Sequence, residues 1–181
     1  FNKVDTTPPV LTSTDNITAE ATSSSGAVVA YTMPTAADDT DGSVFVSCKK
    51  ASGSTFAIGV TTITCTAKDS QDNSATSTFT ITVADTTAPA ITLPANVTAL
   101  QDGEETHVVT IGTGSVTDAV DVLPQLINDA PAGNLFPAGV TNVTWTAEDA
   151  TGNVRTAVQT VTIVANTQPT LTAPADISTA T

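Results

Sequence analysis

Asp85-Thr86-Thr87-Ala88-Pro89 ends one unit of this chain and begins the next. Nearly the same residues, Asp5-Thr6-Thr7-Pro8-Pro9, stand 80 positions earlier, and a degraded copy occurs at Asn166-Thr167-Gln168-Pro169. Self-similarity at a fixed period is the first signal to use, because it fixes the architecture of the whole chain. We therefore expect two complete repeats and the opening of a third, as an excerpt from a longer tandem array.

The period divides the chain into four segments. Residues 1–4 are expected to be a tail or the end of a preceding unit, and 166–181 the first strand of a third repeat. The two segments between them, 5–84 and 85–165, are each long enough for a small domain with its own core. The sequence therefore predicts two tandem domains.

The charge balance limits the partners. Lys and Arg together number 5 and Asp and Glu 18, which gives a formal net charge of −13. Such a chain repels nucleic acids and anionic membranes, and it attracts cations or simply stays soluble. No apolar run approaches the roughly 20 residues of a membrane-spanning helix, so no membrane insertion is expected in this segment.

The apolar residues alternate with threonine, which is typical of strands with one buried face. Ile63, Cys65 and Ala67 alternate in this way, as do Phe79, Ile81 and Val83. We also expect one continuous third strand over 44–48 and an irregular crossover over 53–59. Short strands separated by acidic and glycine-containing turns predict an all-β fold, with two antiparallel sandwiches arranged end to end.

At this level of detail the sequence resembles the hyalin repeat (HYR) family of immunoglobulin-like extracellular modules. The resemblance covers nearly the whole chain. It is carried in the first repeat by the opening motif Asp5-Thr6-Thr7-Pro8-Pro9, the Gly-to-Thr segment 53–61, the acidic turn 66–73 and the closing strand 79–83. In the second repeat it is carried by residues 136–141 and 146–153. It implies a secreted, extracellular or cell-surface location and a role in adhesion or extracellular matrix.

The two cysteines, Cys48 and Cys65, both lie in the first repeat and form no CxxC pattern, so a disulfide is favoured over a metal or redox site in an exported protein. The third and sixth strands are neighbours in one sheet of an immunoglobulin-like sandwich. We therefore predict a Cys48–Cys65 bridge within a sheet. In the second repeat Trp145 stands at the position equivalent to Cys65, and we expect it to cover the same region.

Acidic residues gather in the turns. In a sandwich whose strands alternate in direction, the loops after the second and sixth strands return to the pole where the first strand begins. Several carboxylates with amide and backbone oxygens are what Ca²⁺ requires, and we expect calcium at the junction between the domains. The alternative is that these are ordinary exposed turn residues. The candidate ligands are Asp5, Asp38, Asp41, Asp69, Asp72, Asn73, Asp85, Asp118, Asp121, Asp149 and Asn153.

No catalytic constellation is evident. The single histidine, His107, is expected on the surface of a strand, and no nucleophile–base pair or phosphate-binding loop accompanies it. The chain is therefore not expected to be an enzyme. Three N-glycosylation sequons are present, at Asn16, Asn96 and Asn142.

Two functions remain open. The first is a structural or adhesive module of an extracellular filament, stalk or surface coat, which contacts copies of itself head to tail or neighbouring repeats of the same chain. In that case the lone strand of 166–181 is expected to pack against another copy or the continuing array. The second is a carbohydrate- or ice-binding adhesin module that uses the threonine-rich strand faces, with surface glycans as partners.

Overall fold

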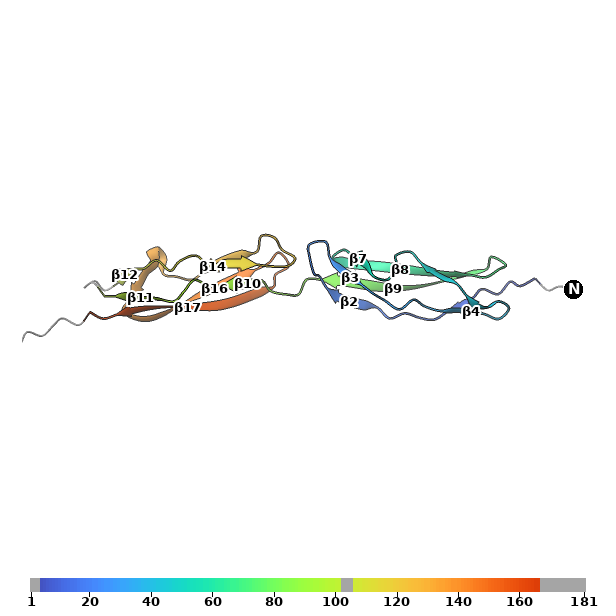
Figure 1. Cartoon of the computed structure of the whole chain (residues 1–181), viewed down its shortest axis with the longest axis horizontal. Helices are drawn as coiled ribbons and strands as arrows, with labels where there is room; N and C mark the ends of the chain where they lie inside the picture. Colours follow the sequence, from blue (N-terminus) through green and yellow to red (C-terminus); the bar gives the residue numbers. More distant parts are fainter. Residues whose placement is uncertain (1–3, 102–105, 167–181) are drawn as a thin grey trace, which may run out of the picture. The chain divides into compact units, whose positions relative to one another are not determined.

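The structure is a computed structural model that describes residues 4–101 and 106–166 (Figure 1). Strands make up every regular element of these residues except one 3-10 turn, η1 (Ala132–Asn134). The all-β fold predicted from the alternation of apolar residues is therefore confirmed. The expected assembly strand covers residues 166–181, and all of it after residue 166 lies outside the described residues.

The first repeat forms three sheets. A four-stranded sheet has the order β2-β9-β8-β6, a three-stranded sheet the order β1-β4-β5, and β3 pairs with β7. The strands are β1 (Val10–Leu11), β2 (Ile17–Glu20), β3 (Ala27–Val29), β4 (Ala36–Asp38), β5 (Gly42–Val44), β6 (Val46–Cys48), β7 (Ser54–Phe56), β8 (Gly59–Lys68) and β9 (Ser74–Ala84).

The second repeat follows the same plan. Its four-stranded sheet has the order β11-β17-β16-β14, and β10 pairs with β13 and β12 with β15. The strands are β10 (Ala90–Thr92), β11 (Val97–Leu100), β12 (Thr106–Val108), β13 (Ser115–Thr117), β14 (Gln125–Asn128), β15 (Leu135–Pro137), β16 (Gly139–Glu148) and β17 (Val154–Val164).

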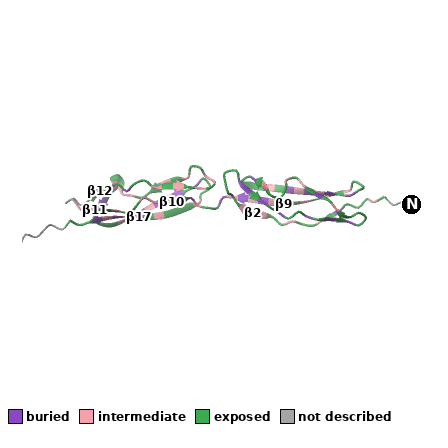
Figure 2. Cartoon of the chain, in the orientation of Figure 1, coloured by how far each residue is buried: buried purple, intermediate pink, exposed green. Residues whose placement is uncertain are grey.

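The long hairpin β8–β9 shows why the alternation predicts the fold. Its ten paired positions place Ile63 opposite Phe79 and Thr64 opposite Thr78, so apolar residues share one face and threonines the other. Ile63 and Phe79 are buried, whereas Thr64 is half-buried and Thr78 exposed. From Phe79 onward the buried residues of β9 alternate with half-buried ones, and Figure 2 colours the strand by this burial. Burial of the apolar face stabilises the sandwich by roughly 25 cal/mol per Å² removed from water.

The predicted third strand is interrupted at Phe45, which differs from the expectation of one continuous strand. β5 pairs with β4, while β6 pairs with β8 in another sheet, so the chain changes sheets between them. Phe45 stands at that change and is 84% exposed. The supposed irregular crossover over 53–59 also contains a strand, because β7 pairs with β3.

The first strand is broken in both repeats. β1 pairs with β4, whereas β2 runs parallel to the last strand β9, with Ile17 opposite Ile81 and Glu20 opposite Ala84. In the second repeat β11 runs parallel to β17 in the same way. The last strand of each repeat is therefore held by the second half of its own first strand.

By packing, the described residues fall into two compact units. One holds residues 4–90, 116–125 and 147–155, and the other holds 91–101, 106–115, 126–146 and 156–166. Each sheet contains strands of one repeat only. The division by packing instead groups two segments of the second repeat, 116–125 and 147–155, with the first unit. The domain bounds 5–84 and 85–165 therefore stay a prediction.

The core of the first repeat is closed by a disulfide. Cys48 and Cys65 face each other in the pairing of β6 with β8 and are bonded. Beside them the Tyr31 ring packs edge-on against Phe79, with 5.0 Å between the ring centroids, and its hydroxyl donates to the backbone oxygen of Lys50. The predicted bridge within one sheet is present.

The second repeat replaces the bridge with a hydrogen-bonded pair. Trp145 is buried, and its indole nitrogen donates to Oε1 of Gln159 at 3.2 Å. The Gln159 amide donates in turn to the backbone oxygens of Ala95 and Ile111, both at 2.7 Å. Gln159 is fully buried, but its side chain has partners at both ends, as a buried polar group requires. The sequence predicts the place of Trp145 but not the role of Gln159.

Candidate functional site

Asp69 and Asn73 close the turn between β8 and β9. Asp69 Oδ1 accepts hydrogen bonds from the backbone nitrogens of Gln71 and Asn73, at 2.9 and 2.8 Å, and Oδ2 accepts from the Asn73 amide at 2.8 Å. The same amide nitrogen donates to the backbone oxygen of Asp5 at 3.3 Å. Asn73 therefore ties the opening of the repeat to a turn 68 residues later, and both carboxylate oxygens of Asp69 are occupied.

The second repeat contains the same arrangement. Asn153 donates to Asp149 Oδ2 at 2.8 Å and to the backbone oxygen of Asp85 at 3.2 Å. Asp149 Oδ1 also accepts from the backbone nitrogens of Thr151 and Asn153. Because both copies use the same atoms, the turn is a constant part of the repeat.

Asp41 and Asp121 join two loops. Both oxygens of Asp41 accept from Ser70, the backbone nitrogen at 2.6 Å and the hydroxyl at 2.9 Å. Asp121 accepts from the backbone nitrogen of Ala150 at 2.9 Å. Asp72 points elsewhere, because it forms an exposed ion pair with Lys68 at 2.7 Å. The structure gives these candidate ligands hydrogen-bond or ion-pair partners within the protein.

Three other carboxylates each leave one oxygen without a partner. Asp5 Oδ1 accepts from the backbone nitrogen of Thr7, and Asp38 Oδ1 accepts from those of Thr40 and Asp41. Their Oδ2 atoms, and Oδ2 of Asp85, are buried without a hydrogen bond. A buried carboxylate oxygen without a donor is costly, so each of these atoms fits an approaching proton or cation.

Asp39 completes a cluster that the sequence analysis missed. One carboxylate oxygen from each of Asp5, Asp38 and Asp39 lies within 4.8 Å of the other two. The two adjacent acids were visible in the sequence as part of an acidic loop, but only Asp38 was chosen as a candidate ligand. The turn after β4 leaves Asp38 buried and Asp39 exposed, with a carboxylate oxygen of each close to Asp5. The second repeat has Ala119 at the equivalent position.

The surroundings shift the pKa values of these acids in different directions. The backbone hydrogen bond from Thr7 lowers the pKa of Asp5. Burial raises the pKa of Asp85, and the negative charges of Asp118, Asp149 and Glu20 add to that rise. Burial also opposes ionisation of Asp149, but the hydrogen bonds from Asn153 and Thr151 outweigh it and lower that pKa to about 2. Hydrogen bonds therefore favour the ionised form of Asp149, whereas burial and the neighbouring negative charges oppose ionisation of Asp85.

The remaining candidates lie away from this pole. His107 on β12 is 5% exposed, so the expectation of a surface histidine is wrong; it faces Phe136 across the pairing of β12 with β15. All three sequon asparagines are exposed. Asn16 Oδ1 accepts from the backbone nitrogen of Thr80 at 2.8 Å, and Asn96 Oδ1 from that of Thr160 at 2.9 Å.

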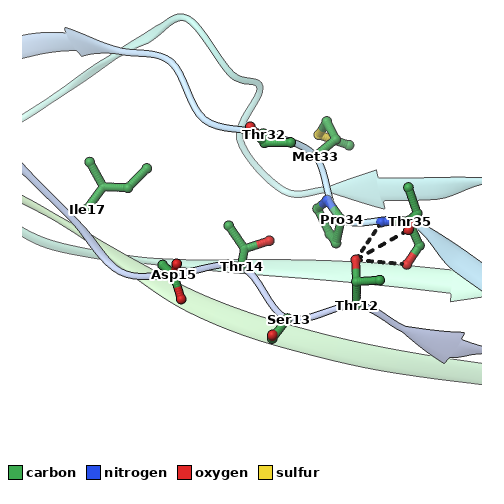
Figure 3. A pocket seen from close by; sticks show the side chains of 9 residues that line it. All are labelled: Thr12, Ser13, Thr14, Asp15, Ile17, Thr32, Met33, Pro34 and Thr35. Atoms are coloured by element: carbon green, nitrogen blue, oxygen red, sulfur yellow. Dashed lines mark hydrogen bonds between the residues drawn. The ribbon is translucent and has the colours of Figure 1, made fainter.

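A shallow hollow of about 440 Å³ lies between the β1–β2 connection and the segment before β4 (Figure 3). Thr12 and Thr35 close one side of it, with the Thr12 hydroxyl 2.9 Å from the backbone nitrogen of Thr35. The nine lining residues include no aromatic ring and no histidine. The hollow therefore lacks an aromatic ring that could stack on a sugar, and Asp15 is the lining residue with an ionisable side chain.

The all-β fold and the Asp–Asn turn that occurs in both repeats define a class of tandem immunoglobulin-like β-sandwich modules. The HYR domain matches residues 4–83 and 84–163, and the chain belongs to the HYR domain family. That family places the chain outside the cell or at its surface. No helix among residues 4–101 and 106–166 is long and apolar enough to cross a membrane.

Several known proteins are similar. Hyalin of Strongylocentrotus purpuratus is 35% identical over 96% of this chain, and hyalin of Lytechinus variegatus is 34% identical over 99% of it. The chain spans 15% and 36% of the lengths of these two relatives. A sushi, von Willebrand factor type A, EGF and pentraxin domain-containing protein of Rattus norvegicus is 34% identical over 71% of the chain, which spans 4% of that protein.

Solved structures of cadherin repeats are more distant. Mouse cadherin-23 EC22-24 is 14% identical, with a TM-score of 0.38 over 88% of this chain and 67% of that chain. The protocadherin gamma B4 extracellular domain is 17% identical, with a TM-score of 0.37 over 90% of this chain and 33% of that one. Likeness at this level says nothing about the function of the chain.

Proposed function

We propose that the chain is a structural and adhesive repeat module of an extracellular filament, stalk or surface coat. One observation carries the proposal: in both repeats an asparagine 68 residues along the chain binds the backbone of the opening aspartate, Asn73 to Asp5 and Asn153 to Asp85. Each repeat thus closes on its own first residues. A unit that completes its own fold can be joined many times along one chain as an independent domain.

The proposed partners are other copies of the chain, in head-to-tail contact, or neighbouring repeats of the same chain. A contact between two different surfaces of identical molecules builds an open filament unless the rotation closes. The test compares residues 1–181 with a version ending at Ala165 by sedimentation velocity over a range of concentrations. We expect association in the longer chain that the shorter one loses. If both versions stay monomeric at every concentration, head-to-tail assembly is excluded.

A second candidate is binding of carbohydrate or ice by the threonine face. On β8 and β9 the pairs Thr62–Thr80, Thr64–Thr78 and Thr66–Thr76 face each other, and all six side chains are exposed or half-buried. Such a flat array of hydroxyls could match ordered water or sugar hydroxyls. Thr64→Val with Thr78→Val should abolish binding to a glycan array or to ice while leaving assembly intact. An unchanged profile would exclude this face.

Glycans at Asn16, Asn96 and Asn142 are a further part of the proposal. The three side chains are exposed, and in Asn16 and Asn96 the structural hydrogen bond uses Oδ1. The atom that carries an N-linked glycan is Nδ2, so attachment and that hydrogen bond are compatible. Peptide mass spectrometry before and after enzymatic removal of N-glycans measures the use of each site.

Calcium is the proposed cofactor, as the acidic turns predict. In the second repeat Asp85 and Asp118 are the candidates that offer carboxylate oxygens, and the partnerless Oδ2 of Asp85 supports that choice. A bound cation would stabilise the folded chain by RT ln(1 + [Ca]/Kd), or about 1–3 kcal/mol at ten to one hundred times Kd. Melting curves in calcium and in excess chelator test it, and superimposable curves would exclude calcium.

A further inference from the structure

We infer that the turn after β4 gives the first repeat a three-carboxylate site for a hard divalent cation, formed by Asp5, Asp38 and Asp39, and that the second repeat has only a weaker version of it. This inference rests on the proposed role of calcium and adds its ligands and its difference between repeats. The three oxygens lie within 4.8 Å of one another. Two ligands of one Ca²⁺ are at most about 5 Å apart, because each lies at about 2.3–2.6 Å from the ion.

The burial of Asp38 is the second observation that points to a ligand. Asp38 is 8% exposed, and its Oδ2 atom has no hydrogen-bond partner. Its Oδ1 atom accepts from the backbone nitrogens of Thr40 and Asp41, which fixes the carboxylate plane. Oδ1 of Asp38 therefore stabilises the turn, while Oδ2 has no hydrogen-bond donor and is available to a cation. A solvated turn residue would instead turn its free oxygen to water.

Asp5 divides its oxygens in the same way. Oδ1 accepts from the backbone nitrogen of Thr7 at 2.9 Å, and Oδ2 is buried without a partner. Asp39 is exposed and is the third carboxylate. Three negative charges at this spacing repel one another unless a cation lies among them. A set of carboxylate oxygens suits Ca²⁺ better than a metal that prefers nitrogen or sulfur.

The second repeat supplies the internal comparison. Asp85 and Asp118 stand at the positions of Asp5 and Asp38, and the Oδ2 atom of Asp85 is again buried without a partner. Ala119 stands where the first repeat has Asp39, so one carboxylate is missing. Since the affinity of a calcium site follows the number of charged ligands, the first repeat should bind more tightly.

The test is calcium titration of residues 1–181 by isothermal calorimetry, with calcium chloride as the only ligand. We expect one tighter site, with a Kd of about 10⁻⁴ to 10⁻³ M as in other extracellular modules. Asp39→Asn should weaken that site at least tenfold, whereas Asp15→Asn, which removes the same charge from an exposed turn, should change it less than twofold. Ala119→Asp should add a second site of similar affinity.

Two results would overturn the inference: no saturable binding up to about 10 mM calcium, or equal losses in Asp39→Asn and Asp15→Asn. Circular dichroism of each variant in chelator shows whether the fold is kept, and Asp38→Asn provides a second removal of charge if Asp39→Asn fails to fold. Sedimentation of the same samples in chelator separates the two ideas. If the chain associates in chelator and calorimetry shows no calcium binding, the proposed module function stands and the cation site is wrong. If calorimetry shows the expected binding but the chain stays monomeric with and without calcium, the site stands and head-to-tail assembly is wrong.

Discussion

The side-chain amide of Asn73 binds the backbone oxygen of Asp5 at 3.3 Å, across 68 residues of sequence. The same nitrogen lies 2.8 Å from Asp69 Oδ2. One side chain therefore holds both the opening of the repeat and the turn that stands at the same pole. The relationship recurs between Asn153 and Asp85 in the second repeat.

Asn73→Asp should destabilise the first repeat. The change keeps the shape of the side chain, removes the donor to both oxygens and places a second carboxylate beside Asp69. Leaving buried acceptors without a donor costs about 1–3 kcal/mol each, so we expect the free energy of unfolding to fall by about 2 kcal/mol or more. Urea denaturation measures it. Asn142→Asp on the exposed part of β16 is the matched control, and equal effects would contradict the role of Asn73.

Asp149 should make stability depend on acid pH. Its pKa is about 2 in the folded chain against an ordinary value of 3.8, so its ionised form stabilises the fold above about pH 3.8. That contribution is lost as the pH falls from 3.8 towards 2, because the unfolded chain takes up the proton first. Melting temperatures of the parent and Asp149→Asn, measured in chelator from pH 2 to 7, should converge near pH 2. Parallel curves would show that Asp149 does not carry this dependence.

Removal of the disulfide should weaken the first repeat. The bridge joins cysteines 17 residues apart, and in the chain-entropy model a loop of this size is worth about 3 kcal/mol. We expect Cys48→Ala with Cys65→Ala to lower the free energy of unfolding by that amount and to make the chain insensitive to reductant. Hydrogen exchange should rise in β6 and β8, with β16 of the second repeat as the internal reference. Equal exchange in both would argue against a stabilising bridge.

Gly114 makes room for Trp145. A Cβ atom at Gly114 would lie 2.9 Å from Cζ3 of the Trp145 ring and 3.2 Å from Cδ2 of Leu126. Gly114→Ala should therefore cost about 1–3 kcal/mol through overpacking. A smaller ring relieves the contact, so Trp145→Phe should cost less in the Gly114→Ala background than in the parent. Thermal denaturation of the parent, the two single variants and the double variant gives the coupling free energy between the two positions. Strictly additive losses of stability would show that the strain does not arise between Gly114→Ala and the Trp145 ring.

The sequence predicts the repeat, the all-β fold and the bridge because these depend on periodicity and strand order. Cys48 and Cys65 required only that the third and sixth strands be neighbours. The break at Phe45 was not predicted, because Val44 and Val46 satisfy alternation whether or not the chain changes sheets between them. That choice depends on which partner strand each residue meets, and partner strands are distant in sequence.

The sequence predicted that acidic turns gather at one end of the sandwich, but it did not distinguish which of their carboxylates could be ligands. Asp41, Asp69 and Asp72 look like Asp5 and Asp38 in the sequence, yet the structure gives them hydrogen-bond or ion-pair partners within the protein. Asp39 was overlooked because the sequence of an acidic loop does not show which of its adjacent carboxylates lies close to Asp5. Gln159 gave no signal either, since a glutamine among strand residues normally faces water.

The parallel pairing of β2 with β9 bears on how a repeat responds to force. Pulling on the two ends of a repeat would drag β2 backwards and β9 forwards along their common direction. The hydrogen bonds from Ile17–Ile81 to Glu20–Ala84 would then be loaded in shear and would have to break together, whereas a hairpin pulled open from one end unzips bond by bond. β11 and β17 have the same geometry. We expect each repeat to resist tension well beyond what four short pairs would bear one at a time.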